Sequence, residues 1–219
     1  MVHRPQIGIA AVSDVSVALC ADAVRRAGGE AQSLPPGRSE SPQETLRPLD
    51  ALLVCGEDDP SSAPAGAWAS ELVRAALDRD VALLAIGAGM QALNLASGGS
   101  VAEVSDHAPM GDGGDEASSY HRIYIAPGSK LAAVVGSGGF VRVNSRHRLG
   151  ISEPQKSNRL MASAYSLEDG VIEALESPEH DWVIGLQFHP ERRLEIPPHF
   201  DRLFNSLVER ARARQSNES

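Results

Sequence analysis

The chain has 219 residues, of which 42% are hydrophobic and 22% charged, a size and composition typical of a globular protein with a sizeable core. Its net charge of -9 argues against a nucleic-acid partner, because binding to phosphates needs clustered Lys and Arg. Its two cysteines, Cys20 and Cys55, are too few for a disulfide scaffold, and no apolar run approaches the ~18 residues that span a bilayer. We therefore expect a cytoplasmic protein that contacts neither nucleic acid nor membrane.

Short apolar runs alternate with amphipathic segments in the first part of the chain. Residues 6–12, 31–34, 50–55 and 81–86 are predicted strands, since buried parallel strands read as short continuous apolar runs. One predicted helix ends at Gly28-Gly29 and another covers residues 68–80. Residues 35–48, rich in Pro, Ser and Gly, are predicted to form a surface loop. Strands that alternate with helices indicate a mostly parallel sheet with helices on both faces.

The second half of the chain has a different pattern. Strand-like segments at residues 122–126, 131–135, 140–143, 160–166, 171–176 and 182–188 follow one another with little helix between them. This half is therefore expected to be partly antiparallel. Pro197-Pro198 opens a last helix, whose apolar stripe runs from Phe200 to Val208. We predict one three-layer α/β domain over residues 1–214, followed by a polar tail at residues 215–219.

The turn Gly87-Ala88-Gly89 connects an apolar strand to a helix and allows three interpretations. It fits the GxGxxA pattern of a dinucleotide-binding loop, for which Asp106 is placed to bind the ribose. It also fits a nucleophile elbow, a sharp turn that needs small neighbours such as Ala85 and Gly89, although its central Gly87 has no side chain. The third interpretation is a plain tight connection.

Another candidate site lies far along the chain, where the apolar segment at residues 182–188 leads to His189, with Glu191 two residues later. A carboxylate that accepts a hydrogen bond from one imidazole nitrogen fixes the tautomer and raises the basicity of the other nitrogen. His189 and Glu191 would then be the base and the orienting group of a Cys-His-Glu system. The motif alone is more typical of an exposed turn, and its place directly after a buried strand is the reason to consider the functional interpretation as well.

These motifs together resemble a known family. Residues 185–191, GLQFHPE, look like the G-x-Q-x-H-P-E signature of class I glutamine amidotransferases. Residues 143–147 and 162–174 are similar to the γ-glutamyl hydrolase-like peptidase branch, which includes the γ-glutamyl-γ-aminobutyrate hydrolases. GMQALN at 89–94 and Gly56-x-Asp58 also match that branch. The resemblance runs from the first strand to the last helix and implies a class I glutamine amidotransferase-like, flavodoxin-like fold.

The resemblance also implies catalytic roles by position. The elbow of the family reads G-x-C-x-G, so Gly87 stands where the nucleophilic cysteine belongs, with His189 as base and Glu191 as orienting group. The oxyanion donors would be the backbone N–H groups of Gly56 and Ala88. Cys55 ends the strand that faces the elbow, and it is an alternative nucleophile as well as a candidate buried core residue.

Binding residues follow from the same resemblance. Gln91 falls where the glutamine of the family contacts the amino-acid head of the substrate. The segment expected to line the pocket contains Asn144, Ser145 and His147. The chain departs from the pattern at two places: Cys55-Gly56 replaces the usual Gly-Gly, and Leu149 replaces the glutamine of His-x-Gln.

Three functions remain open at this point. The first is a non-catalytic family member that binds a small amino-acid-like or γ-glutamyl ligand, or else a protein partner or a second copy of itself. The second is a γ-glutamyl amide hydrolase that uses Cys55 or a water activated by His189. The third, a dinucleotide-binding protein, leaves the C-terminal half unexplained. For the favoured function we expect no cofactor and no metal, because no two of the seven histidines have the i, i+4 spacing of a metal-binding helix.

Overall fold

The computed structural model describes residues 4–11, 14–36, 40–56, 64–104, 107–108 and 117–217, with the backbone alone at 14–16, 64–65 and 217. Nine strands form one sheet in the order β2-β1-β3-β4-β11-β10-β9-β6-β7. Their bounds are, in chain order, β1 Gln6–Ala11, β2 Glu30–Leu34, β3 Ala51–Gly56, β4 Ala82–Gly87, β6 Ser119–Ile125, β7 Gly139–Ser145, β9 Met161–Ser166, β10 Ile172–Glu176 and β11 Val183–Leu186. A second, two-stranded sheet pairs β5 (Ala102–Glu103) with β8 (Leu149–Gly150).

The large sheet has a parallel half and an antiparallel half. Strands β2, β1, β3, β4 and β11 pair in parallel. Strands β10, β9, β6 and β7 continue the sheet in antiparallel pairs. The alternation of strands and helices predicted the first half, and the crowding of strand-like segments predicted the second.

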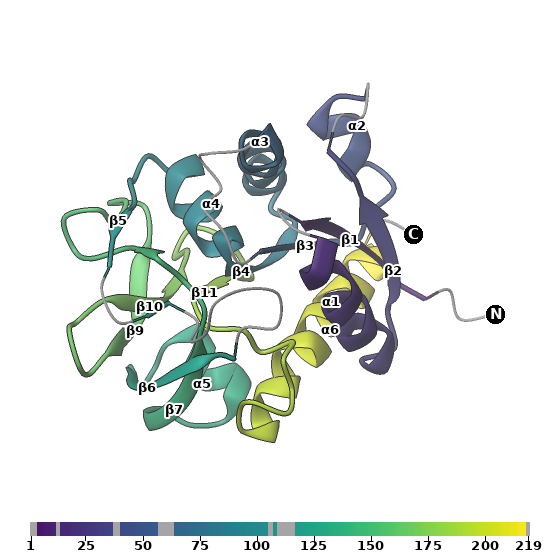
Figure 1. Cartoon of the computed structure of the whole chain (residues 1–219). Helices are drawn as coiled ribbons and strands as arrows, with labels where there is room; N and C mark the ends of the chain where they lie inside the picture. The colour runs from purple at the N-terminus through teal and green to yellow at the C-terminus, as the bar shows by residue number, and fades with distance from the viewer. Residues whose placement is uncertain are drawn as a thin grey trace.

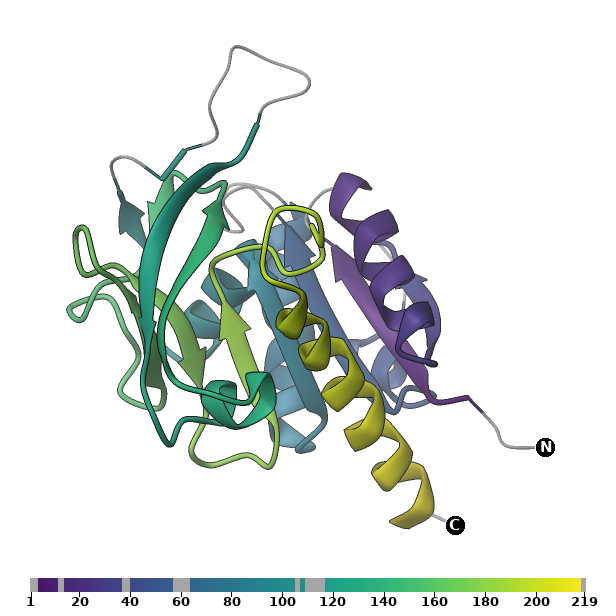
Figure 2. The same ribbon diagram turned by 90° about the horizontal axis from the view of Figure 1, so that it is seen from below.

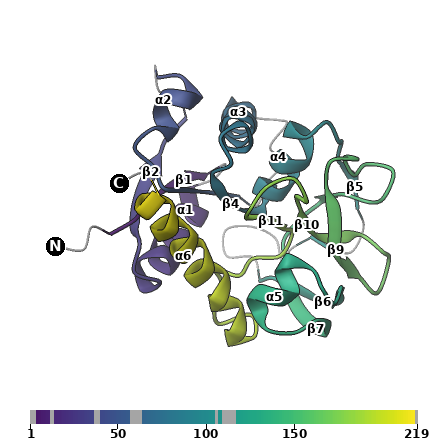
Figure 3. The same cartoon turned by 180° about the vertical axis from the view of Figure 1, so that it is seen from behind.

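Helices cover both faces of the sheet, as Figures 1 and 3 show. One face carries α1 (Asp14–Arg26), α5 (Lys130–Val135) and α6 (Arg202–Asn217), which follows the short η1 (Pro198–Asp201). The other face carries α2 (Pro42–Leu46), α3 (Pro64–Asp78) and α4 (Ala88–Ala96). The three-layer α/β architecture expected from the sequence is confirmed. Within the described part of the chain, no helix has both the length and the hydropathy needed to cross a membrane.

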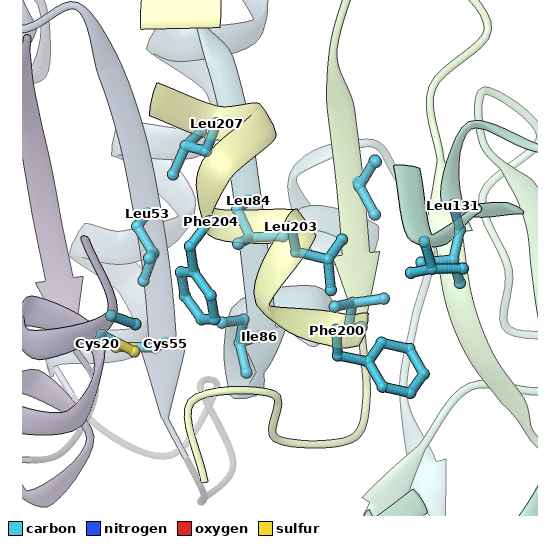
Figure 4. Close-up of a cluster of buried hydrophobic side chains, with 14 of the residues drawn as sticks. Cys20, Leu53, Cys55, Leu84, Ile86, Leu131, Phe200, Leu203, Phe204 and Leu207 are labelled. Atoms are coloured by element: carbon cyan, nitrogen blue, oxygen red, sulfur yellow. The ribbon is translucent and has the colours of Figure 1, made fainter. Parts of the chain in front are cut away.

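The apolar stripe of the last helix builds much of one core. Figure 2 shows α6 lying along the sheet, and Figure 4 shows Phe204 and Leu207 pointing toward Leu53 and Ile86 of the strands beneath. All four side chains are at most 2% exposed. The helix continues to Asn217, beyond residue 214 where the sequence suggested that the polar tail begins.

The predicted strand at residues 131–135 is wrong, because these residues form helix α5. Ser129 caps the helix by accepting a hydrogen bond from the backbone N–H of Ala132, and Gly136 ends it with a φ of +97°. Such a left-handed residue is the usual end of a helix. The apolar residues suit a short helix that buries Leu131 and Val135, and the cap at Ser129 decides between the two interpretations.

The predicted surface loop at residues 35–48 also contains a helix. Ser41 and Glu44 form a capping box in which each side chain bonds the backbone N–H of the other residue. Pro42 occupies the first helical turn, where a missing N–H costs nothing. The Pro-rich and Ser-rich composition that indicated a loop therefore belongs in part to the start of a helix.

Asn94 ties the end of α4 to the segment before β9. Its side-chain amide donates to the carbonyl oxygens of Ser100 (2.7 Å) and Gln155 (3.0 Å), and its Oδ1 accepts from the N–H of Ser157 (2.8 Å). Asn94 is fully buried, so replacing it leaves three polar groups without their partner.

We predict that Asn94→Ala lowers the free energy of unfolding by about 2–5 kcal/mol, because each buried polar group left unpaired costs about 1–3 kcal/mol. Urea denaturation followed by circular dichroism measures the loss. Asn205→Ala, at an exposed position of α6, is the matched control and should cost less than about 0.5 kcal/mol. Equal losses in the two variants would contradict the role given to Asn94.

Candidate functional site

Three neighbouring parallel strands end at the same edge of the sheet. Gly56 at the end of β3 is paired with Gly87 at the end of β4, and β11 lies beside β4 and leads to His189. Ligands of open α/β sheets bind at the carboxyl ends of their parallel strands. The fold thus brings together motifs that are far apart in the sequence.

Gly87 forms a sharp turn between β4 and α4. Its φ of 58° and ψ of -118° lie in a region that residues with a side chain rarely adopt. Gly89, two residues later, is needed for a different reason: a Cβ there would overlap the backbone carbonyl of Val54, because α4 packs directly on β3. This strand-turn-helix geometry is the one expected of an elbow.

The surroundings of Gly87 show what a side chain would meet there. A Cβ placed on Gly87 would lie 2.7 Å from Cε1 and 3.1 Å from Nε2 of His189. It would also overlap the carbonyl oxygen of Gly56, which is the nearest atom to this point. Gly56 therefore turns a hydrogen-bond acceptor toward the elbow, where the resemblance implied an N–H donor.

His189 and Glu191 form a buried pair. The Nδ1–H of His189 donates to Oε1 of Glu191 over 2.8 Å, and neither side chain is more than 1% exposed. This bond leaves the lone pair of the imidazole on Nε2. Nε2 faces the elbow and has no hydrogen-bond partner among the described residues.

Asn144 holds the backbone of the histidine in place. Its Oδ1 accepts from the N–H of His189 over 2.9 Å, and its Nδ2 donates to the carbonyl of His189 over 3.1 Å and to Glu195 over 2.8 Å. Asn144 is fully buried at the end of β7. The structure thus makes Asn144 a support for the histidine, in addition to the pocket-lining role that the resemblance implied.

The other predicted binding residues divide between two places. Gln91 lies on α4, one turn after the elbow, and its Nε2 donates to the carbonyl of Leu149 over 3.0 Å. Ser145 donates to the carbonyl of His107 over 2.9 Å, and His147 donates from Nδ1 to the carbonyl of Leu149 over 2.9 Å. Ser145 and His147 therefore belong to a neighbouring polar cluster around Glu173.

The thiol of Cys55 lies in an apolar core, as Figure 4 shows. Cys55 is fully buried next to Cys20, and burial together with the hydrogen bond of the Cys20 thiol to Cys55 raises the pKa of Cys20 well above its usual value. Cysteines buried in apolar surroundings are usually inert. These surroundings favour the core interpretation of Cys55.

Sequence reasoning missed the cluster around Glu173, which contains His107, His121 and His147. Burial opposes the ionisation of Glu173, but the imidazoles of His121 and His147 hold the pKa of its carboxyl well below its usual range. Burial lowers the pKa of His147. The sequence signals were His147, already a candidate binding residue, and the apolar run GVIEAL at residues 170–175, in which Glu173 is the one charged residue. Asp58 and Asp106, singled out in the sequence, lie outside the described residues.

A model of the Peptidase C26 family matches residues 5–191 of the chain. The chain belongs to the Peptidase C26 family. Among its relatives, a Mycobacterium tuberculosis protein named as a glutamine amidotransferase is 34% identical over 213 residues, covering 87% of this chain and 65% of that protein. The γ-glutamyl-γ-aminobutyrate hydrolase of Escherichia coli O157:H7 is 29% identical over 195 residues, covering 78% of this chain and 76% of that enzyme. The chain thus spans just under two thirds of the M. tuberculosis relative.

Solved structures agree with this Peptidase C26 assignment at the level of the fold. The glutaminase domain of Trypanosoma brucei CTPS superposes with a TM-score of 0.71 at 17% identity, covering 94% of this chain and 93% of that one. A glutamine amidotransferase from Thermotoga maritima superposes with a TM-score of 0.65 at 15% identity, covering 99% and 100%. The family resemblance and the class I glutamine amidotransferase-like fold, both inferred from the sequence, are confirmed.

We predict that Gly87→Ala destabilises the protein by about 1–3 kcal/mol more than Gly98→Ala, because an added Cβ at residue 87 overlaps fixed backbone. Both glycines have a positive φ, 58° and 95°, so each variant carries backbone strain. A Cβ on Gly98 meets no described atom within 4 Å, which makes this variant the matched control. Urea denaturation measures the free energy of unfolding of both variants. Equal losses would contradict the prediction, because they would show that the backbone of Gly56 shifts at little cost.

Proposed function

We propose that this member of the Peptidase C26 family has lost cysteine-dependent hydrolysis and binds a small amino-acid-like or γ-glutamyl ligand. One observation carries the proposal. Gly87 occupies the turn beside the base His189, with Nε2 only 3.1 Å from the point where a Cβ would begin. In the resembling enzymes this is the position of the nucleophilic cysteine.

The chemistry of acyl transfer supports the loss of activity. Covalent transfer from a γ-glutamyl amide needs a side chain that attacks the carbonyl carbon, and glycine has none. The tetrahedral intermediate also needs hydrogen-bond donors for its oxyanion. The carbonyl oxygen of Gly56, which is nearest to the elbow, is an acceptor and would repel such an oxyanion. Enzymes of this type lose many orders of magnitude in rate without their nucleophile.

Unpartnered polar atoms near the elbow support the binding of a polar ligand. Oε1 of Gln91, Nε2 of Gln187 and Nε2 of His189 are buried and have no hydrogen-bond partner among the described residues. A buried polar atom without a partner costs about 1–3 kcal/mol, so a ligand that pairs with it gains affinity. The ammonium, carboxylate and amide groups of a γ-glutamyl compound match such donors and acceptors. The γ-glutamyl-γ-aminobutyrate hydrolases among the relatives favour this ligand class.

A hydrolase that uses a water molecule is the second candidate. The pairing of His189 with Glu191 favours it, because the unpaired Nε2 could accept a proton from water. A relocated nucleophile at Cys55 has less support, since its thiol lies in the apolar core next to Cys20. For a protein partner, a homodimer or a dinucleotide, no contact of the described residues gives comparable support.

We predict that the protein binds L-glutamine or γ-glutamyl-γ-aminobutyrate in a calorimetric titration without hydrolysing it. Gln91→Leu should weaken this binding by about tenfold or more, because it removes a hydrogen-bonding amide worth about 1.4 kcal/mol or more. His199→Gln, at a half-buried position on η1, is the control and should bind like the wild type. Absence of binding to every γ-glutamyl compound tested would contradict the ligand proposal.

Release of γ-aminobutyrate or ammonia, measured over hours at high protein concentration, should not exceed that of buffer. Turnover abolished by His189→Ala but kept by Cys55→Ala would favour the water mechanism. Turnover abolished by Cys55→Ala would favour the relocated nucleophile. Either result would overturn the loss of hydrolysis.

A further inference from the structure

Three histidines from separate segments converge on one buried carboxylate. The Nε2 atoms of His121 and His147 lie 3.1 Å and 3.5 Å from Oε1 of Glu173, and Nδ1 of His107 lies 3.7 Å from the same oxygen. The glutamate side chain is fully buried, and none of the three histidine side chains is more than 8% exposed. The donor atoms of His107, His121 and Glu173 all lie within 4.8 Å of one another.

An irregularity in strand β10 aims Glu173 at this cluster. Strand β9 pairs Tyr165 with Ile172 and Ala164 with Ala174, so the register skips Glu173. Bulges of this kind turn a side chain away from the regular alternation of a strand and are common beside functional sites. Ile172 and Ala174 would lie on the same face of a regular strand, but here they pack in opposite cores. The carboxylate of Glu173 lies between them, next to the histidines.

Hydrogen bonds fix which imidazole nitrogens carry lone pairs. Nε2 of His107 donates to Asp169 over 2.9 Å, so Nδ1 of the neutral ring is an acceptor that faces Glu173. The Ser145 hydroxyl lies closer to the carbonyl oxygen of His107 (2.9 Å) than to this Nδ1 (3.3 Å), which favours donation of its single proton to the carbonyl. Nδ1 of His147 donates to the carbonyl of Leu149, so its Nε2 is also an acceptor facing the carboxylate.

Acceptors that face one another in a buried site repel unless a proton or a metal ion lies between them. Both carboxylate oxygens of Glu173, both ring nitrogens of His121 and Nε2 of His147 are buried without a hydrogen-bond partner in the part of the chain that the structure describes. The short distance between His121 and Glu173 is therefore not a well-aligned hydrogen bond. The donor atoms of His107, His121 and Glu173 are close enough together to share one ion.

We propose that His107, His121 and Glu173 bind a divalent transition-metal ion, with His147 as the fourth donor. Two donors of one tetrahedral ion lie about 3.3–3.4 Å apart when the bonds are about 2.0–2.1 Å long, and the separations to Glu173 bracket this value. Imidazole and carboxylate ligands suit Zn²⁺, Fe²⁺, Co²⁺ and Ni²⁺ rather than Mg²⁺ or Ca²⁺. Asp169 behind His107 repeats the carboxylate–histidine–metal arrangement that orients metal ligands. The site joins strands β6 and β10 to the segments that carry His107 and His147.

We predict that the purified, untagged protein binds one Zn²⁺ per chain, measured by elemental analysis after dialysis and by calorimetric titration of the chelator-treated protein. Added Co²⁺ should give the visible absorption of a tetrahedral ion, and Zn²⁺ should raise the thermal midpoint of unfolding. His121→Gln should lose at least 100-fold in Zn²⁺ affinity. Asp169→Asn should lose about 10–100-fold, because it keeps the ligands and removes only the carboxylate that orients His107.

His199→Gln is the control and should bind Zn²⁺ like the wild type. Asp169 is a third exposed and lies in a turn, so its variant tests the site even if His121→Gln fails to fold. Circular dichroism checks the fold of each variant. Absence of stoichiometric Zn²⁺ and Co²⁺ binding by the wild-type protein would overturn the proposal, and so would equal affinities of the wild type, His121→Gln and Asp169→Asn. Neither outcome depends on a γ-glutamyl ligand or on hydrolysis.

Discussion

The backbone of Gly87 is the constraint on which the rest of the site depends. Strand β4 must turn into α4 within one residue, and the φ of 58° and ψ of -118° at Gly87 make this turn between β3 and β11. Because β3 and β11 flank β4, Gly56 and His189 lie on either side of the turn. Glycine adopts this conformation without the strain of about 1–3 kcal/mol that another residue carries. The sharp strand-turn-helix geometry therefore forms with no side chain at its centre.

The pairing of His189 with Glu191 beside a glycine has a structural reason. Glu191 accepts from Nδ1 of His189, and Asn144 bonds both backbone groups of the histidine. All three residues are buried, and removing one member of such a network leaves the others without partners. The network fixes the chain after β11 to the end of β7. Its stability depends on these bonds, whether or not the histidine ever accepts a proton from a substrate.

The pattern of apolar residues predicted the buried strands of the sheet. It did not predict segments whose pattern fits both a strand and a helix. The strands at residues 6–11, 51–56 and 82–87 are buried on both faces, so their sequence reads as a continuous apolar run. The apolar segment after Ser129 fits a strand or a short helix equally well, and only the capping bonds show that it is α5. Motif positions predicted that His189 and Glu191 accompany Gly87. The motif positions could not show that Gly56 turns its carbonyl oxygen toward the elbow. The same sequence is compatible with a peptide that presents either its N–H or its carbonyl oxygen there.

The cluster around Glu173 was beyond sequence reasoning for a topological reason. His121 lies on β6, His147 follows β7 and His107 precedes β6. Only the antiparallel order of β10, β9, β6 and β7 brings these histidines to one carboxylate. No fixed spacing marks such a set, in contrast to two histidines one turn apart on a helix.

The carbonyl of Leu149 connects this cluster to the elbow. It accepts from Nδ1 of His147 on one side and from Nε2 of Gln91 on the other, over 2.9 Å and 3.0 Å. An ion that holds His147 would also hold this carbonyl, and with it the amide of Gln91 one turn after the elbow. A donor that is already fixed loses less conformational entropy when a ligand binds. The two polar sites of this fold thus share one hydrogen-bonded link, and an ion in one would pre-organise the other.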